Sequence, residues 1–191
     1  MTPDGMEALF DRNGRRKYLS ADEWRRFLNA ADGANAKTRA LCRTLAYTGC
    51  RISEALSLTP AHIDLETGRI VLRTLKRRKL VFRAVPVPPC LIAELNALAK
   101  NRAPQARLWE WCRQTGWRRV KRVMEEARVR GPQATPKGLR HGFGIAAAEE
   151  NIPPGLTQRW MGHARLETTT LYQHAVGREE RTFAKRLWRH L

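Results

Sequence analysis

The sequence lacks the short motifs of nucleotide-dependent and common hydrolytic enzymes. It has no GxxxxGKS/T loop, GxGxxG turn, HExxH helix or GxSxG elbow. Nucleotide hydrolysis, dinucleotide binding, zincin chemistry and the usual serine hydrolases are therefore unsupported. Carboxylates are few and scattered, with no DxD or acidic triad. A Mg²⁺-dependent nuclease needs several converging carboxylates, so this class is unsupported as well.

Long apolar runs and paired cysteines are also missing. No apolar run approaches the roughly 18 residues that span a bilayer, and the first residues lack the basic-then-apolar order of a secretory signal. We therefore expect a soluble, cytoplasmic protein with no membrane partner. The four cysteines include no CxxC pair, which argues against a zinc or disulfide framework. Cys42 and Cys50 are expected to be buried thiols.

Basic residues outnumber acidic residues two to one. The 191 residues include 36 Lys or Arg and 18 Asp or Glu, which gives a formal net charge of +18. Two stretches concentrate this excess, with six basic residues and no acid over 73–83, and seven basic and two acidic residues over 113–130. Hydrophobic content of 42% is enough for a core. The balance predicts a folded protein with a polyanionic partner, for which nucleic acid is the best fit.

Capping residues and periodicity predict an α+β fold that is mostly α-helical. Ser20 and Glu23 form a capping box that begins a helix to about Ala31. A helix over 37–48 is followed by Gly49, which suits the left-handed position after a helix. The helices account for most of the expected structure, and a short β segment interrupts them.

That β segment is a small antiparallel hairpin or three-stranded sheet. The remaining expected elements are a short helix at 52–58, a turn at 64–68, strands at 68–75 and 80–87, and helices near 90–100, 115–130, 136–150, 153–161, 166–174 and 177–190. We expect 1–18 to be a polar N-terminal arm and 19–191 to be one compact domain.

Three motifs occur in order: TGCRISEALSL at 48–58, TPKGLRHGF at 135–143 and WMGHARLETTTLYQHA at 160–175. Together they resemble the tyrosine recombinase (phage integrase) family. Its pattern is TGxRxxEhxxL, then HxxRH, then GH followed nine residues later by Tyr, and here 172 − 163 = 9. The resemblance covers roughly 20–180. It implies the catalytic-domain fold of DNA breaking-rejoining enzymes.

The resemblance implies that Arg51 and Arg140 are the two catalytic arginines. It also implies that His163 is the late histidine and that Tyr172 is the nucleophile. These residue types suit the chemistry, because a Tyr oxygen attacking a phosphodiester leaves a 3′-phosphotyrosine and a free 5′-hydroxyl. Arginines stabilise the negative charge of the transition state. We therefore expect strand cleavage and rejoining that need neither metal, ATP nor another cofactor.

Two lysines complete the expected catalytic set. The hairpin lysine that protonates the leaving oxygen is best matched by Lys76, and Lys79 at the same tip is the alternative. Lys137 stands where the family usually has His. An ammonium donates to a phosphate oxygen but can accept the tyrosine proton only after it is deprotonated, so Lys137 is expected to be a phosphate ligand, with proton transfer as the alternative role.

Other residues are expected to support the active site or to bind DNA. Glu54 occupies the family's acidic position and supports the site, and His141 is expected to brace the scaffold through Glu54. The expected DNA-binding side chains are Arg73, Arg77, Arg78, Lys79, Arg83, Arg118, Arg119, Lys121 and Arg122.

The predicted function is a site-specific DNA recombinase or integrase of a mobile element, acting on double-stranded DNA in the nucleoid. A type IB topoisomerase-like or hairpin-forming strand transferase, and a non-catalytic modulator of another recombinase, are the alternatives. The family's N-terminal core-binding domain is expected to be missing, so the chain is a minimal enzyme, a fragment or a modulator. The chain is expected to form a homo-oligomer on DNA, from dimer to tetramer, through a C-terminal helix over 177–191.

Overall fold

The computed structural model of the chain describes residues 9–74, 81–172 and 184–189. Its helices are α1 Ala21–Asp32, α2 Ala36–Thr48, α3 Ile52–Ala55, the 3₁₀ turn η2 Pro60–His62, α4 Pro89–Ala99, α5 Arg113–Glu126, α6 Pro136–Glu149, α7 Pro154–Met161 and α8 Glu167–Thr170. The strands are β1 Ile63–Asp64, β2 Arg69–Arg73 and β3 Phe82–Pro86. The predicted mostly helical α+β fold with a small antiparallel sheet is confirmed.

The expected start of α1 and end of α2 are both confirmed. Ser20 Oγ accepts a hydrogen bond from the Glu23 amide, and the Glu23 carboxylate accepts one from the Ser20 amide, which makes a capping box. Gly49 follows α2 in the left-handed conformation, with φ of 58°. These caps satisfy backbone groups that a helix end leaves without partners.

The sheet has three strands in the order β1-β2-β3, all antiparallel. This outcome decides between the hairpin and the three-stranded sheet expected from the sequence. Asp64 belongs to β1 and pairs with Arg69 of β2, so the turn begins one residue later than expected. Ile70, Leu72 and Val85 are buried on one face of the sheet, as the two-residue alternation of strands requires.

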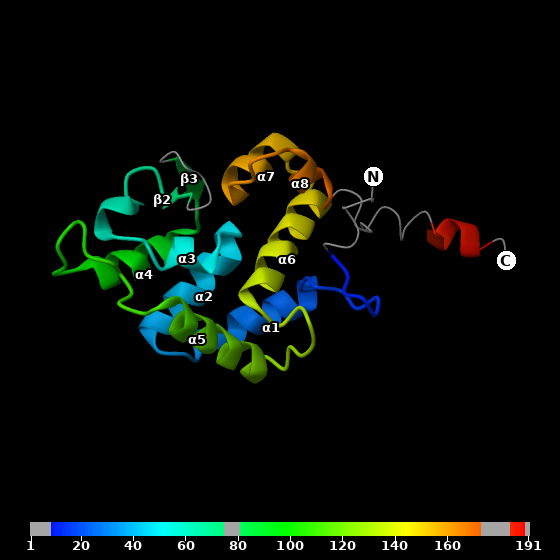
Figure 1. Ribbon diagram of the computed structural model, residues 1–191, viewed down its shortest axis with the longest axis horizontal. Coiled ribbons are helices and arrows are strands. Elements are labelled where there is room, and N and C mark those ends of the chain that lie inside the picture. The colour runs from blue at the N-terminus through cyan, green and yellow to red at the C-terminus, as the bar shows by residue number, and fades with distance from the viewer. Residues whose placement is uncertain (1–8, 75–80, 173–183, 190–191) are drawn as a thin grey trace.

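Helix α2 lies at the centre of the helical layer, packed against α1, α4, α5 and α6 (Figure 1). Leu41 and Leu45 from α2 are fully buried beside Phe27 of α1. Cys42 and Cys50 are buried in the same core, as predicted. Burial raises the pKa of Cys42 to about 12 and that of Cys50 to about 11, so both remain thiols at neutral pH.

The described part of the N-terminal segment, residues 9–18, packs against the body, where the sequence predicts a polar arm over 1–18. Leu9 is 1% exposed and joins Ile145, Met161 and Tyr172 in a second apolar cluster. Arg16 Nη2 donates to a Glu23 carboxylate oxygen at 2.8 Å, which ties the segment to α1. The burial of Leu9 could not be predicted, because one isolated leucine has no periodicity and its contacts lie on distant elements from α6 to the end of α8.

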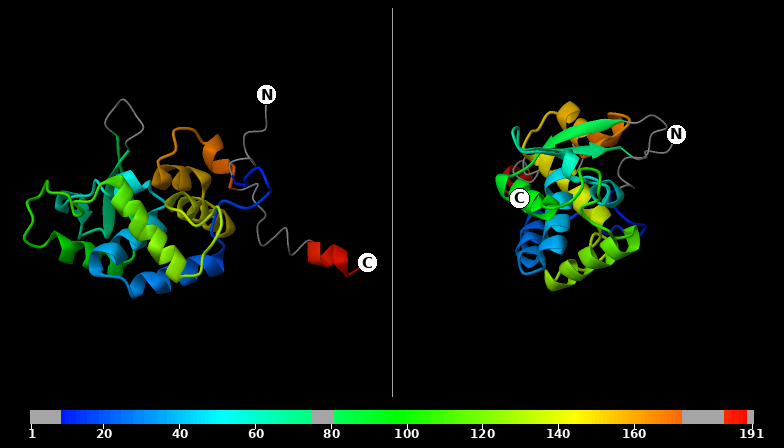
Figure 2. Two further views of the ribbon diagram at one scale, coloured as in Figure 1. Left: turned by 60° about the horizontal axis from the view of Figure 1, so that its bottom comes forward. Right: turned by 90° about the vertical axis from the view of Figure 1, so that its left-hand side faces the viewer.

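The C-terminal elements also differ from their predicted lengths. Helix α8 covers only 167–170 of the expected 166–174. Within the expected helix 177–190, residues 184–188 are helical, and the rest of that range apart from 189 lies outside the described residues. Leu187 and Trp188 are 62% and 57% exposed. Figures 1 and 2 show this helical piece apart from the body, and one compact domain over 19–191 stays a prediction.

Candidate active site

Arg51 reaches the site because the chain reverses after α2. The left-handed Gly49 ends α2, and Arg51 then forms the N-cap of α3. A Cβ on Gly49 would lie 2.6 Å from the ring of Phe143 in α6, so only glycine permits this approach. The reversal therefore places Arg51 beside α6, the helix that carries Arg140.

Glu54 is a fully buried carboxylate held between two arginines. Its oxygens accept from Arg51 Nη1 at 3.0 Å, from the Arg51 amide at 3.0 Å and from Arg83 Nη2 at 2.6 Å. Burial acts to raise the pKa of Glu54, but the charge and hydrogen bonds of Arg83 and Arg51 outweigh it and hold the pKa below its ordinary value. Glu54 is thus ionised and orients Arg51.

Arg83 was predicted to be a DNA-binding residue, but it does not lie on the surface. Its side chain is buried, and it donates to Glu54, to Thr74 Oγ1 at 2.9 Å and to the Trp160 carbonyl at 2.8 Å. Side chains alternate between the two faces of a strand, and Arg83 lies on the buried face of β3 together with Val85. That two-residue spacing from a core valine was the signal available in the sequence. Arg83 instead links β3 to α3 and α7.

Arg140 is buried, with one side of its guanidinium fixed. Nη1 donates to the carbonyls of Gly49 at 2.6 Å and Met161 at 2.8 Å. Nη2 is buried and has no hydrogen-bond partner among the described residues. Burial, followed by repulsion from Arg51, lowers the pKa of Arg140 to about 10, so the group stays charged at neutral pH. A fixed cation with a spare donor suits an anionic ligand.

Tyr172 and His163 lie ring against ring. Their centroids are 6.1 Å apart at an interplanar angle of 23°, and His163 Nδ1 lies 2.8 Å from Thr169 Oγ1. Tyr172 is 3% exposed, and a Cβ on Gly144 would come within 2.5 Å of its ring. Burial raises the pKa of Tyr172, partly offset by the Arg140 and Arg51 charges. Burial and then Arg140 lower the pKa of His163 to about 3.

His141 contacts Tyr172 and not Glu54, which corrects the bracing role expected of it. Its Nδ1 lies 3.1 Å from Tyr172 Oη. The imidazole is 8% exposed, and burial followed by the Lys137 charge lowers its pKa to about 4. Neighbouring positions on one helix point in different directions, so the residue after Arg140 faces the tyrosine and not α3. The sequence carried no signal for this pairing.

The other expected site residues lie around this centre or outside the described part of the chain. Lys137 is exposed in the first turn of α6. Lys76, Arg77, Arg78 and Lys79 lie outside the described residues. Arg73, Arg118, Arg119 and Arg122 are exposed, and Lys121 is half-buried. Within the described ranges no three His, Cys, Asp or Glu side chains are grouped to hold a metal, and no helix is long and apolar enough to cross a membrane.

Two arginines, two histidines and a tyrosine meeting beside a three-stranded sheet define a tyrosine recombinase catalytic domain. Residues 17–178 match the model of the phage integrase family, and the chain belongs to that family. It is 30% identical over 166 residues to Tyrosine recombinase XerA of Thermococcus kodakarensis, covering 82% of this chain and 57% of that protein. It is 26% identical over 173 residues to Tyrosine recombinase XerD of Haemophilus influenzae, covering 84% and 58%.

Solved structures agree on the fold. The crystal structure of XerA recombinase superposes with a TM-score of 0.74 at 25% identity, over 88% of this chain and 64% of that one. The catalytic domain of bacteriophage HP1 integrase gives 0.65 at 22% identity, over 88% and 93%. The chain therefore spans nearly all of an isolated catalytic domain, but a little over half of the curated relatives it matches.

Proposed function

We propose that this domain cuts and rejoins DNA strands in site-specific recombination, through a covalent 3′-phosphotyrosine link at Tyr172. The observation that carries the proposal is the buried Tyr172, with His141 Nδ1 3.1 Å from its oxygen and the His163 ring stacked on its own, in a site where Arg140 keeps a spare Nη2 donor. The names of the relatives support it, since XerA and XerD are called tyrosine recombinases. A mere DNA-binding module needs no positioned nucleophile of this kind.

The residues suit an in-line displacement at phosphorus. Tyr172 Oη attacks the scissile phosphate, the bond to the 5′ oxygen breaks, and the 3′ phosphate stays on the tyrosine. The spare Nη2 of Arg140 and the guanidinium of Arg51 donate to the non-bridging oxygens, and His163 and Lys137 are further donors. Lys76, outside the described residues, is the proposed acid for the leaving oxygen. Reversal of these steps rejoins the strand.

The deciding experiment is a suicide substrate that carries a nick beside the scissile phosphate. We expect the wild-type chain to form a covalent protein–DNA adduct and Tyr172→Phe to form none, because the phenylalanine has no oxygen to attack with. Denaturing gels measure the adduct. An adduct with Tyr172→Phe would show that another residue is the nucleophile, and no adduct with the wild type would refute the proposed function. The adduct is expected to form equally in excess EDTA.

The arginines are tested by separating cleavage from binding. Arg51→Ala and Arg140→Ala are expected to lower the single-turnover cleavage rate far more than DNA affinity, because they stabilise charge that grows in the transition state. The loss expected for one such donor is about a hundredfold. Equal losses of cleavage and affinity would make both residues phosphate anchors only.

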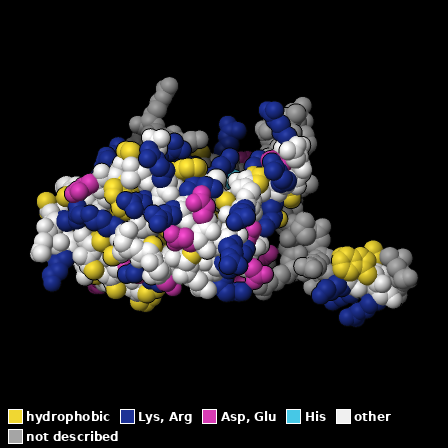
Figure 3. Space-filling model, turned by 90° about the horizontal axis from the view of Figure 1, so that it is seen from below, with side chains coloured by type: hydrophobic (Ala, Val, Ile, Leu, Met, Phe, Trp, Pro, Cys, Tyr) yellow, Lys and Arg dark blue, Asp and Glu magenta, His cyan; other side chains and the backbone are white. Residues whose placement is uncertain are grey.

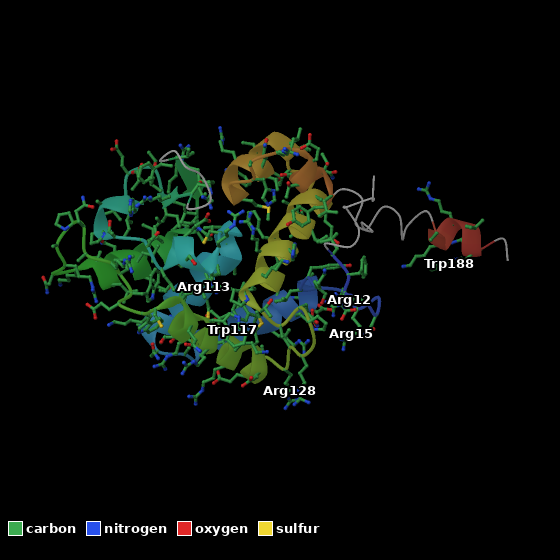
Figure 4. The ribbon with its side chains drawn as sticks, in the orientation of Figure 1. Arg12, Arg15, Arg113, Trp117, Arg128 and Trp188 are labelled. Atoms are coloured by element: carbon green, nitrogen blue, oxygen red, sulfur yellow. The ribbon has the colours of Figure 1, made fainter. Side chains whose placement is uncertain are left out.

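The proposed DNA-binding surface of the domain lies along α5. Gly116 lies against Ile52 of α3 and Leu56 at its C-terminal end, so α5 begins beside the helix that Arg51 caps. Figure 4 shows Arg113 and Trp117 on this helix and Arg128 just beyond it. Trp117 is 39% exposed, so an apolar ring accompanies the exposed basic side chains.

The proposed assembly is a homo-oligomer, from dimer to tetramer, formed on double-stranded DNA through residues 177–191. Support comes from Leu187 and Trp188, which leave apolar surface exposed on the described part of this segment. Deleting 177–191 is expected to abolish cooperative assembly on DNA, seen as loss of the slower bands in a mobility-shift gel, while the thermal unfolding midpoint stays near that of the full chain. Unchanged assembly would refute this role.

A further inference from the structure

The phenol of Tyr172 makes a buried hydrogen bond that phosphate binding does not explain. His141 Nδ1 lies 3.1 Å from Tyr172 Oη, and the two residues are 8% and 3% exposed. We propose that His141 is the general base that takes the proton from Tyr172 when the strand is cleaved. The inference rests on the proposed function, because only a nucleophilic Tyr172 has to lose its proton.

Other groups near the tyrosine are less suited to this step. Lys137, at the family's usual histidine position, is an exposed ammonium without a lone pair. His163 turns its ring face to Tyr172, and its Nδ1 is engaged by Thr169 Oγ1. An imidazole accepts a proton in the plane of its ring, and among the hydrogen bonds of the described residues only that of His141 joins an imidazole nitrogen to Tyr172 Oη.

The surroundings of His141 keep its ring uncharged in the free chain. The charged groups that face it are Lys137 and Arg140 on its own helix and Lys17 on the N-terminal segment, and the uncharged rings of His163 and Tyr172 pack beside them. Burial has the largest effect on the pKa of His141, and these cations add to it, so that the pKa is lowered to about 4. The neutral ring has a lone pair at neutral pH.

The same cations repel a protonated His141 and so lower its pKa. A DNA phosphate bound beside them acts in the opposite direction and raises this pKa. Its negative charge offsets Lys137 and Arg140, so His141 becomes a stronger base once the scissile phosphate is in place. The tautomer that accepts at Nδ1 carries its hydrogen on Nε2, which is buried and has no partner among the described residues. The base is therefore weak in the free chain and is strengthened by the substrate.

The step balances without another reactant. The O–H bond of Tyr172 breaks as the bond from Oη to phosphorus forms, and the proton moves to His141 Nδ1. The bond from phosphorus to the 5′ oxygen breaks, and that oxygen takes its proton from the hairpin lysine of the proposed function. In rejoining, the imidazolium of His141 returns its proton to the departing phenolate, so no net proton is consumed by the pair.

The first test is His141→Asn, because asparagine places an amide oxygen close to the position of Nδ1. It keeps a hydrogen-bond acceptor for Tyr172 but cannot take its proton. We expect the single-turnover cleavage rate on the nicked substrate to fall about a hundredfold or more, with DNA affinity within about twofold of wild type. His62→Asn, a half-buried histidine on η2, is the matched control and is expected to cleave within about twofold of wild type.

The second test separates a base from a residue that only positions the tyrosine. Replacing Tyr172 by a ring-fluorinated tyrosine lowers the pKa of the phenol itself. In the His141→Asn variant, this replacement is expected to raise the single-turnover cleavage rate at least about tenfold. If His141 only positioned the phenol, the replacement would not raise the rate. A 5′-bridging phosphorothiolate, which removes the need for an acid, is expected to leave the defect in place.

Cleavage by His141→Asn within about threefold of wild type, or no rescue by fluorination, would overturn the proposal. If the Asn variant loses DNA binding, His141→Gln is measured by the same criteria. The proposed function fails separately, by the absence of a Tyr172 adduct in the wild type.

Discussion

At the scale of single residues, the site keeps its histidines neutral and its arginines charged. Burial and nearby cations lower the pKa of His141 to about 4 and that of His163 to about 3. Arg140 has a pKa lowered to about 10, still far above neutrality. The free site is thus strongly cationic without protonated histidines, which suits the binding of a phosphate diester.

These low histidine pKa values make the free energy of unfolding depend on pH. A histidine in the unfolded chain binds a proton near its ordinary pKa of about 6.5, but folded His141 and His163 do not. The unfolded state therefore binds more protons between about pH 6.5 and the folded pKa values of about 4 and about 3, so the free energy of unfolding falls as pH is lowered through this window. Urea unfolding at about pH 7.5 and about pH 5 measures the fall. His141→Asn is expected to show a smaller fall than wild type, and an equal fall would contradict the assignment.

At the scale of secondary structure, the site is made where element ends meet. The end of α2, the start of α3, strand β3, the middle of α6 and the end of α7 meet through Arg83 and Arg140. Figure 2 shows the strands and α7 on the same side of the body. Each of these arginines joins segments far apart in the chain, so the site depends on packing as much as on sequence.

The contact between α6 and Tyr172 requires glycine. We expect Gly144→Ala to displace the Tyr172 ring, because the added Cβ would stand 2.5 Å from it. Such overpacking costs typically about 1–3 kcal/mol, and here it also moves the nucleophile, so adduct formation is expected to fall at least tenfold. Gly155→Ala on α7, where nothing lies within 4 Å, is the matched control and is expected to cleave as wild type. Normal cleavage by Gly144→Ala would mean that the ring is not held here.

Arg83 is expected to be a major source of stability. Arg83→Met leaves Glu54 buried with one partner fewer and removes the bond to the Trp160 carbonyl, which costs about 3–5 kcal/mol for a broken buried pair. Arg122→Met, at an exposed ion pair with Glu126, is the control and is expected to change stability by less than about 0.5 kcal/mol. Urea unfolding measures both, and similar small effects would refute the structural role of Arg83.

At the scale of the whole molecule, the charge has two uses. Arg51 and Arg140 lie in the site, and in the part of the chain that the structure describes every Lys and Arg except Arg83 and Arg140 is partly or fully exposed. Figure 3 shows Lys and Arg spread over the face seen from below, with fewer Asp and Glu among them. This excess matches the net charge of +18 and supports DNA binding that weakens as salt is added.

The α5 surface is expected to set part of that salt dependence. Changing Arg118, Arg119 and Arg122 together to Gln is expected to reduce the slope of log affinity against log salt by about 0.9 for each phosphate contact that is lost. Fluorescence anisotropy with duplex DNA at several salt concentrations gives the slope. Lys100→Gln with Arg107→Gln, exposed residues at the end of α4 and beyond it, is the control and is expected to keep the wild-type slope. An unchanged slope in the triple variant would place the DNA elsewhere.

The sequence by itself determined the local structure and the family. The Ser20–Glu23 capping box and Gly49 act on neighbouring backbone groups, so their outcome was predictable from a few residues. Only the tertiary structure decided the pairings of Arg83 with Glu54 and of His141 with Tyr172, whose members are 29 and 31 residues apart. Such contacts depend on which faces of the packed elements meet. A shift of one residue along a strand or helix turns the side chain to another face and changes its partner.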